Sequence, residues 1–184
     1  MKDYRLQLIH SGLKGIKEDV TMKKILSALL ISMSLTISAQ AAQKLSGTSH
    51  DFTLPSNSGK NVRLSELRGE VVMINFWASW CGPCQQEMPI LEELYQRYNR
   101  AGFTILGVNV EPDSEEANKI LNNVKISFPI LYDKKSVVSE LYNVEAMPST
   151  VIIDRSGNMR YLHRGYKPGY EDEYKTQIKE LIRE

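Results

Sequence analysis

The distribution of apolar positions divides the chain into alternating strand-like and helix-like segments. Residues 71–78 (VVMINFWA) and 103–110 (FTILGVNV) are continuous apolar runs with β-branched and aromatic members, which is typical of buried strands. In residues 81–100 apolar side chains recur at helical spacing and predict an amphipathic helix. These side chains are Met88, Leu91, Leu94, Tyr95 and Tyr98. Pro89 interrupts the pattern and should kink this helix, because proline removes a backbone donor.

The rest of the chain continues the alternation. Apolar runs predict strands at residues 51–55, 128–132, 149–154 and 159–165. Helical periodicity predicts helices at residues 114–124, 136–144 and 170–184, with a brief helical turn at 64–69. This order indicates an α/β domain with a mixed, mostly parallel central sheet, helices on both faces and an antiparallel hairpin at the C-terminal edge.

An apolar run near the N-terminus follows a different pattern. Met22 is followed by Lys23 and Lys24, then by the apolar residues 25–37, and the segment closes with the small residues of Ala-Gln-Ala at 39–41. This order predicts a secretory signal peptide at residues 22–41 and a soluble mature chain that begins near Ala42. The run is shorter than the ~18–20 residues that span a bilayer, so an uncleaved membrane anchor is the weaker alternative.

Residues 1–21 precede this signal, although a signal peptide should start a protein. We interpret them as an upstream extension with Met22 as the true start, since residues 17–19 (KED) can be encoded by a ribosome-binding sequence. Residues 48–184 then form one domain of ordinary size.

Composition and charge narrow the function classes. With 42% hydrophobic and 24% charged residues, the chain has the balance of a soluble globular protein. Its formal net charge of +1 gives no reason to expect a nucleic-acid partner or a membrane-surface partner. The sequence contains no oligomerisation device, and we expect a monomer.

The chemistry is concentrated at Cys81 and Cys84, which are the only two cysteines of the chain. Covalent haem attachment needs a histidine after the second cysteine, where this chain has Gln85. A structural zinc site needs four ligands, and we expect no metal and no cofactor. A purely structural disulfide closing so short a loop would stabilise the fold only weakly. Reversible thiol–disulfide exchange is the remaining interpretation.

The predicted placement of the cysteines suits this exchange. The strand at residues 71–78 delivers Cys81 to a helix N-terminus, where free backbone N–H groups and the helix dipole favour a thiolate. Cys81 is therefore the predicted nucleophile, and Cys84, one turn later, is predicted to resolve the mixed disulfide. Gly82 and Pro83 set the turn and leave room for a partner chain.

The chain resembles the thioredoxin superfamily, and within it the exported TlpA/ResA-type thiol–disulfide oxidoreductases. The resemblance covers nearly all of residues 48–184. It is carried by the WCGPC motif at residues 80–84, by Pro89, by MPST at residues 147–150 and by Glu87. It implies a thioredoxin-like fold with an N-terminal β extension and with an inserted helix and strand between about residues 111 and 135.

The resemblance also implies roles for three further residues. In the family the proline that matches Pro148 is cis, and the backbone of Met147 would then pair with an extended substrate peptide. Without the resemblance a trans bond would be expected, since only about 5–6% of X-Pro bonds are cis. Glu87 would move the proton of Cys84 if burial raises its pKa. From the residues alone, a solvated glutamate at a helix N-terminus is an equal alternative.

Other residues near the motif have plainer interpretations. Thioredoxin has a buried aspartate where this chain has Asn75, which cannot exchange a proton, so Glu87 is the better candidate for proton transfer. Trp77 and Trp80 are expected to pack around the site, with Trp80 also shaping the contact surface. His163 is expected to be an ordinary histidine near a sheet edge.

The signal pattern predicts a protein of the periplasm or of another extracytoplasmic space. The sequence predicts that it is a protein-disulfide reductase, because Gly-Pro between the cysteines is the dipeptide of thioredoxin, a reductant. The resemblance implies protein-disulfide substrates, apocytochrome c among them, and a membrane thiol electron donor of the DsbD/CcdA kind. Two alternatives stay open. One is a thiol oxidant or isomerase of the same fold, and the other is a copper-binding metallochaperone with His163 as third ligand.

Overall fold

The computed structural model describes residues 42–184, so the predicted upstream extension at 1–21 and the predicted signal peptide at 22–41 lie outside the described residues. The strands are β1 (Gln43–Lys44), β2 (Thr53–Pro55), β3 (Asn61–Arg63), β4 (Val71–Trp77), β5 (Phe103–Asn109), β6 (Ile130–Tyr132), β7 (Ser149–Ile153) and β8 (Met159–Arg164). The helices are η1 (Leu64–Leu67), α2 (Gly82–Tyr98), η2 (Asn99–Ala101), α3 (Glu115–Asn123), α4 (Val137–Leu141) and α5 (Tyr170–Arg183). No helix within residues 42–184 is long and apolar enough to cross a membrane.

The central sheet has six strands in the order β1-β8-β7-β4-β5-β6, and a separate hairpin pairs β2 with β3. β4 runs parallel to β5, and β5 runs parallel to β6. The pairs β4–β7, β7–β8 and β1–β8 are antiparallel. The predicted mixed sheet and the N-terminal β extension are thus confirmed. The expected predominance of parallel pairing is wrong, because β7 returns antiparallel to β4 and β1 adds a further antiparallel strand.

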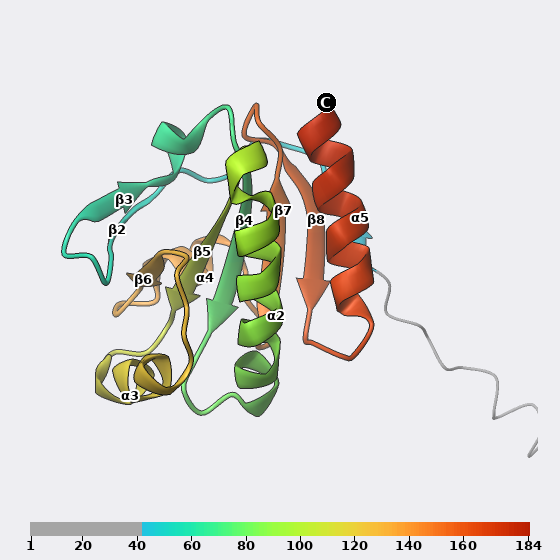
Figure 1. The fold of residues 1–184 in the computed structure, drawn as a ribbon. Coiled ribbons are helices and arrows are strands. Elements are labelled where there is room, and N and C mark those ends of the chain that lie inside the picture. The colour runs from blue at the N-terminus through green and yellow to red at the C-terminus, as the bar shows by residue number, and fades with distance from the viewer. Residues whose placement is uncertain (1–41) are drawn as a thin grey trace, which may run out of the picture. The chain divides into compact units, whose positions relative to one another are not determined.

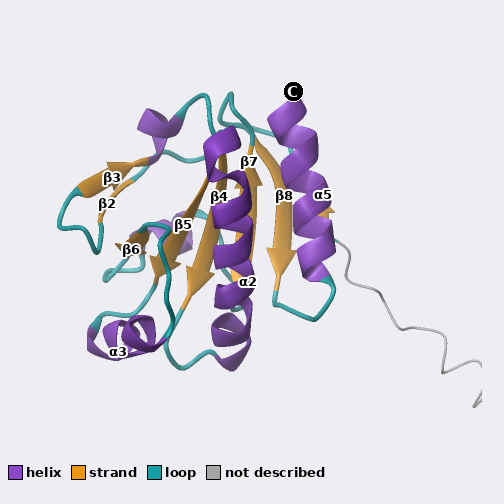
Figure 2. Cartoon of the chain, in the orientation of Figure 1, coloured by secondary structure: helices purple, strands orange, loops and turns teal. Residues whose placement is uncertain are grey.

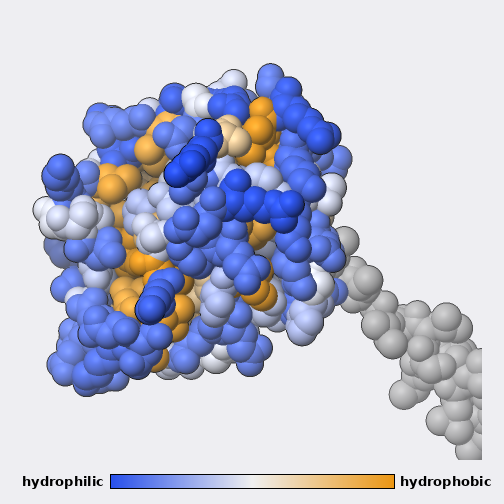
Figure 3. All heavy atoms as spheres, in the orientation of Figure 1, coloured by the Kyte–Doolittle hydropathy of each residue, from blue (hydrophilic) through white to orange (hydrophobic). Residues whose placement is uncertain are grey.

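The sheet separates two apolar cores, as the alternating side chains of β4 require. Val71, Met73 and Trp77 face one core, together with apolar side chains of α2 and α5. Val72, Ile74 and Phe76 face the other, which the β2–β3 hairpin, η1 and α4 cover. Figure 1 shows α2 and α5 in front of the sheet and α4 behind it, and Figure 2 shows the same layers by secondary structure. The surface on the α2 and α5 side is mostly hydrophilic (Figure 3).

The helix that follows the cysteines has nearly the predicted bounds. α2 stays one continuous helix across Pro89, and the kink expected there stays a prediction. Gly102 ends the following η2 turn in the left-handed conformation with a φ of 84°. Met88, Leu91, Leu94 and Tyr98 are buried as expected.

The predicted insertion forms α3 and β6, which pack at the β5 edge of the sheet. Gly107 in β5 makes this packing possible, because a Cβ there would stand 2.8 Å from the Cδ1 of Ile130 and 3.0 Å from the Cε2 of Phe128. α4 is shorter than the helix predicted at residues 136–144, since Asn143 takes a left-handed φ of 49° just after it.

Candidate active site

Cys81 and Cys84 lie at the junction between β4 and α2 and form a disulfide. Cys81 is the N-cap residue of α2, and the backbone N–H of Cys84 donates to the Sγ of Cys81 at 3.2 Å. That N–H would also stabilise a thiolate on Cys81, as would the positive end of the helix dipole. Cys81 is 5% exposed and Cys84 is 1% exposed, so an incoming disulfide meets Cys81 first.

A surface groove of about 440 Å³ opens beside Cys81. Residues 80–83 line one side and residues 144–147 line the other, so the groove brings the WCGPC motif and Met147 together. The Met147–Pro148 bond is cis, as the family resemblance implied. Trp80, at 70% exposure, stands out from the surface, whereas Trp77 is fully buried in the core. A substrate-binding role for Met147 and Pro148 stays a prediction.

Glu87 lies one helical turn beyond Cys84 on α2, and its side chain is fully buried. Burial raises the pKa of its carboxyl group from 4.5 to about 7, although two hydrogen bonds oppose the shift. A carboxyl group with this pKa exchanges protons readily at neutral pH. The solvated glutamate considered above is therefore wrong for Glu87, while its role as a proton acceptor stays a prediction.

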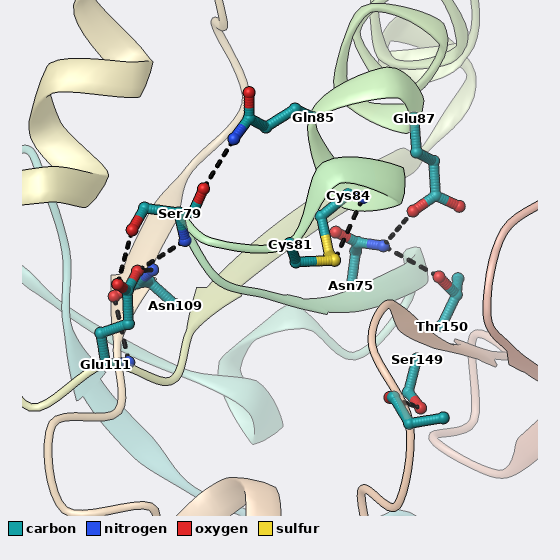
Figure 4. Close-up of a disulfide and its surroundings, with 11 residues drawn as sticks. Asn75, Ser79, Cys81, Cys84, Gln85, Glu87, Asn109, Glu111, Ser149 and Thr150 are labelled. Atoms are coloured by element: carbon teal, nitrogen blue, oxygen red, sulfur yellow. Dashed lines mark hydrogen bonds between the residues drawn. A yellow bond between two sulfur atoms is a disulfide. The ribbon is translucent and has the colours of Figure 1, made fainter.

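The two donors to Glu87 come from other elements of the fold. The Nδ2 of Asn75, in β4, donates to Oε2 at 2.8 Å, and the hydroxyl of Tyr174, in α5, donates to Oε1 at 2.7 Å. Asn75 Nδ2 also donates to the Oγ1 of Thr150 at 2.9 Å, two residues after the cis proline. Figure 4 shows Asn75 between Glu87 and Thr150. Asn75 thus acts as a donor where an aspartate would place a second carboxylate against Glu87.

Sequence reasoning missed the roles of Tyr174 and Thr150. The periodicity of residues 170–184 assigns Tyr174 to the apolar face of its helix, which is correct, but the pattern does not reveal where the hydroxyl points. The sequence did hold one indication of the role of Tyr174. A tyrosine at a core position needs a hydrogen-bond partner for its hydroxyl, so a buried polar partner could have been expected.

A second polar network holds the loop just before Cys81. Glu111 accepts from the backbone N–H of Ser79 at 2.7 Å, from the Ser79 hydroxyl at 2.6 Å and from the Nδ2 of Asn109 at 2.8 Å. Gln85 Nε2 donates to the Ser79 carbonyl at 2.6 Å, so every polar group of Ser79 is engaged. In Figure 4 the cysteines lie between this network and Glu87.

Sequence reasoning missed Glu111 as well, although a signal was present. Ser79 and Glu111 each come two residues after the end of a buried strand, β4 and β5 respectively. The carboxyl ends of adjacent parallel strands lie at the same sheet edge, so polar residues that follow them should meet.

Replacing Glu111 by alanine should loosen the loop that carries Cys81. A hydrogen bond to a charged group contributes about 1.5–3 kcal/mol, so the Ser79 amide should exchange its hydrogen roughly 10–100 times faster, as native-state hydrogen exchange would measure. Glu115→Ala is the matched control, because Glu115 pairs only with Lys119 among the ion pairs of the described chain, at 3.1 Å on the surface of α3. An unchanged hydrogen-exchange rate of the Ser79 amide in Glu111→Ala would contradict the role of Glu111 in holding this loop.

His163 lies in β8 and is 1% exposed, so it is buried although it was expected to be an ordinary histidine near a sheet edge. Its Nε2 shares a 2.8 Å hydrogen bond with the Oε1 of Gln177, and its ring packs edge-on against Tyr170 and Tyr174. Burial lowers its pKa, which keeps the ring neutral. Within residues 42–184 no three His, Cys, Asp or Glu side chains gather as metal ligands would.

Known proteins resemble this chain in sequence. The family model for the AhpC/TSA family matches residues 47–162. The thiol-disulfide oxidoreductase ResA of Geobacillus kaustophilus is 36% identical over 146 residues, which are 77% of this chain and 84% of that protein. The thioredoxin-like protein YneN of Bacillus subtilis is 35% identical over 131 residues, 70% of this chain and 76% of that protein.

A solved structure agrees with these relatives. A crystal structure from Chlorobium tepidum, which bears the name of thiol:disulfide interchange protein DsbE, superposes with a TM-score of 0.72 at 34% identity. The match covers 77% of this chain and 99% of that one. The cysteine pair forms its disulfide at the N-terminus of α2, within a thioredoxin-like fold. Together with the family match and these relatives, this shows that the chain belongs to the AhpC/TSA family and is a thiol–disulfide oxidoreductase of the ResA type.

Proposed function

We propose that this oxidoreductase works as a reductant of protein disulfides outside the cytoplasm. The observation that carries the proposal is the Cys81–Cys84 disulfide at the N-terminus of α2, with the buried carboxyl group of Glu87 one turn further on. The Gly-Pro dipeptide between the cysteines, shared with thioredoxin, supports the reducing direction.

The reaction begins from the dithiol form. The Cys81 thiolate attacks a substrate disulfide, so a bond forms between Cys81 Sγ and one substrate sulfur while the other leaves as a thiolate. Glu87 then accepts the proton of the Cys84 thiol, and the Cys84 thiolate attacks Cys81 Sγ and expels the second substrate sulfur. The substrate gains two electrons and becomes a dithiol, and the Cys81–Cys84 disulfide of the present structure is the oxidised product.

The proposed location requires a source of electrons. The N-terminal signal pattern at residues 22–41 supports export to the periplasm or another extracytoplasmic space, where a reductant must be recharged after each turnover. A membrane thiol donor of the DsbD/CcdA kind would supply the two electrons through a second exchange at Cys81. We propose apocytochrome c as one substrate, because its haem-binding cysteine pair must be reduced. Normal c-type cytochromes in a deletion strain would count against that substrate.

The reduction potential of the purified protein tests the direction of the reaction. The protein would be equilibrated in glutathione or dithiothreitol buffers and its free thiols followed by alkylation. We expect a potential near that of thioredoxin, about −270 mV. A value near about −120 mV, where strong oxidants lie, would make the protein a disulfide donor instead. Absence of any reversible transition would remove the redox function, and copper titration of the reduced protein would then test the metallochaperone alternative.

A further inference from the structure

Buried hydrogen bonds from two other elements of the fold hold the carboxyl group of Glu87. The amide nitrogen of Asn75 has two hydrogens, and it donates to Glu87 Oε2 at 2.8 Å and to Thr150 Oγ1 at 2.9 Å. The Tyr174 hydroxyl donates to the other carboxylate oxygen, Oε1, at 2.7 Å.

The four linked side chains are all buried, with Asn75 at 2%, Glu87 at 0%, Thr150 at 1% and Tyr174 at 0% exposure. Each donor therefore depends on an acceptor inside the protein rather than on water. The burial of Tyr174 and the nearby Glu87 charge raise the tyrosine pKa, so its hydroxyl keeps its proton and remains a donor. Asn75 and Tyr174 thus each donate a hydrogen bond to one oxygen of the Glu87 carboxylate.

We propose that Tyr174, in the C-terminal helix α5, is a positioning residue for Glu87, and that its hydroxyl holds one carboxylate oxygen and stabilises the ionised form that receives the Cys84 proton. The inference rests on the proposed function, since it assumes that Glu87 acts on Cys84. It extends the proposed active site to α5, which is far from the cysteine motif in sequence. In this inference the Tyr174 hydroxyl of α5 favours the ionised form of the Glu87 carboxyl group.

The surroundings of Glu87 leave few other groups to set its charge. Tyr174 approaches from α5, Asn75 from β4, and Cys84 lies on the same helix. Tyr166, before α5, feels the charge of Glu87 without a hydrogen bond to it, and His163 packs behind Tyr174 as a neutral ring. Burial and the two donors account for the shift of the Glu87 pKa, and no cation of the described domain contributes to it.

The test is Tyr174→Phe, which deletes the hydroxyl and keeps the ring. With a donor to the carboxylate gone, the Glu87 pKa should rise by about one unit above its value near 7. Carbon NMR of the Glu87 carboxyl group would measure this midpoint directly. At pH 7 the ionised fraction would fall from about a half to about a tenth, and Cys84 attack should slow roughly fivefold.

That rate is measurable with an aromatic disulfide that releases a coloured thiol, 5,5′-dithiobis(2-nitrobenzoate). Cys81 releases the first coloured thiol and Cys84 releases the second, so the second phase reports the resolving step. The variant should approach the wild-type rate as the pH rises above its shifted midpoint. A merely structural defect would instead lower the rate at every pH.

Tyr161→Phe is the matched control. Like Tyr174, Tyr161 is a buried tyrosine whose hydroxyl donates to a glutamate. Its acceptor is Glu180 of α5, at 2.8 Å, and not Glu87. This variant should leave both the Glu87 midpoint and the second phase unchanged. Thr150→Val should raise the midpoint less than Tyr174→Phe does, and Thr150→Ser, which keeps the hydroxyl, should restore it.

The outcomes separate the inference from the proposed function. An unchanged Glu87 midpoint in Tyr174→Phe would overturn the positioning role of Tyr174. A raised midpoint with an unchanged second phase would support the positioning role and overturn proton transfer from Cys84 to Glu87. A raised midpoint with a matching shift of the rate profile would support both.

Discussion

Replacing Cys81 by serine should reduce disulfide exchange by at least about a thousandfold, because a hydroxyl group lacks the thiolate that attacks the substrate sulfur. The N-cap position of Cys81 and the N–H that Cys84 aims at its sulfur favour the thiolate at this residue. Insulin reduction with dithiothreitol as electron source would measure the loss.

Cys84→Ser separates the two cysteines, because it keeps the nucleophile and removes the resolving thiol. It should react once and stop as a mixed disulfide on Cys81, which intact mass spectrometry would detect. With the aromatic disulfide described above, it should release one coloured thiol per chain, and the wild type should release two. Stable adducts on Cys84 in the Cys81→Ser variant, together with rapid turnover by Cys84→Ser, would reverse the assignment.

The second large effect concerns stability, since Glu87 is buried with a pKa raised from 4.5 to about 7. The folded protein keeps a proton on Glu87 at pH values where the unfolded chain has already released it. The stabilisation that protonated Glu87 gives the folded state is therefore fully present below about pH 4.5. It is lost as the pH rises to about 7, and one pKa unit corresponds to about 1.4 kcal/mol. The free energy of unfolding should therefore fall by about 3 kcal/mol across this range.

Glu87→Gln should abolish this loss, because glutamine keeps the shape of the protonated acid without a charge. Urea unfolding of the oxidised protein from pH 4 to pH 8 would compare the two profiles. His163 acts in the opposite direction: burial lowers its pKa, so its contribution falls as the pH drops below about 6.5. The difference between wild type and variant isolates Glu87 from this effect.

Glu93→Gln is the control, since Glu93 is exposed on the same helix. The free energy of unfolding of this variant should show the same pH dependence as that of the wild type. If wild type and Glu87→Gln ran parallel over the whole range, the raised pKa of Glu87 would be wrong.

Local sequence was sufficient for most of the fold. The apolar runs at β4 and β5 and the helical spacing in α2 and α5 predict these elements to within about two residues, because side chains buried on a strand or on one helix face repeat with the period of the backbone. The direction of strand pairing was harder to predict, and the expected predominance of parallel strands was wrong. A strand has the same apolar pattern whether its neighbour is parallel or antiparallel.

For the site, the sequence determined the cysteine pair and its place at a strand-to-helix junction, and the family resemblance added Glu87 as a candidate. Spacing along one helix places Cys81, Cys84 and Glu87 one turn apart, so their relation is local. Only the tertiary structure decided the rest. Ser79 and Glu111 are 32 residues apart, Asn75 and Thr150 are 75 apart, and Glu87 and Tyr174 are 87 apart. Burial and long-range hydrogen bonds set the charge of a carboxyl group, and these exist only once distant segments pack together.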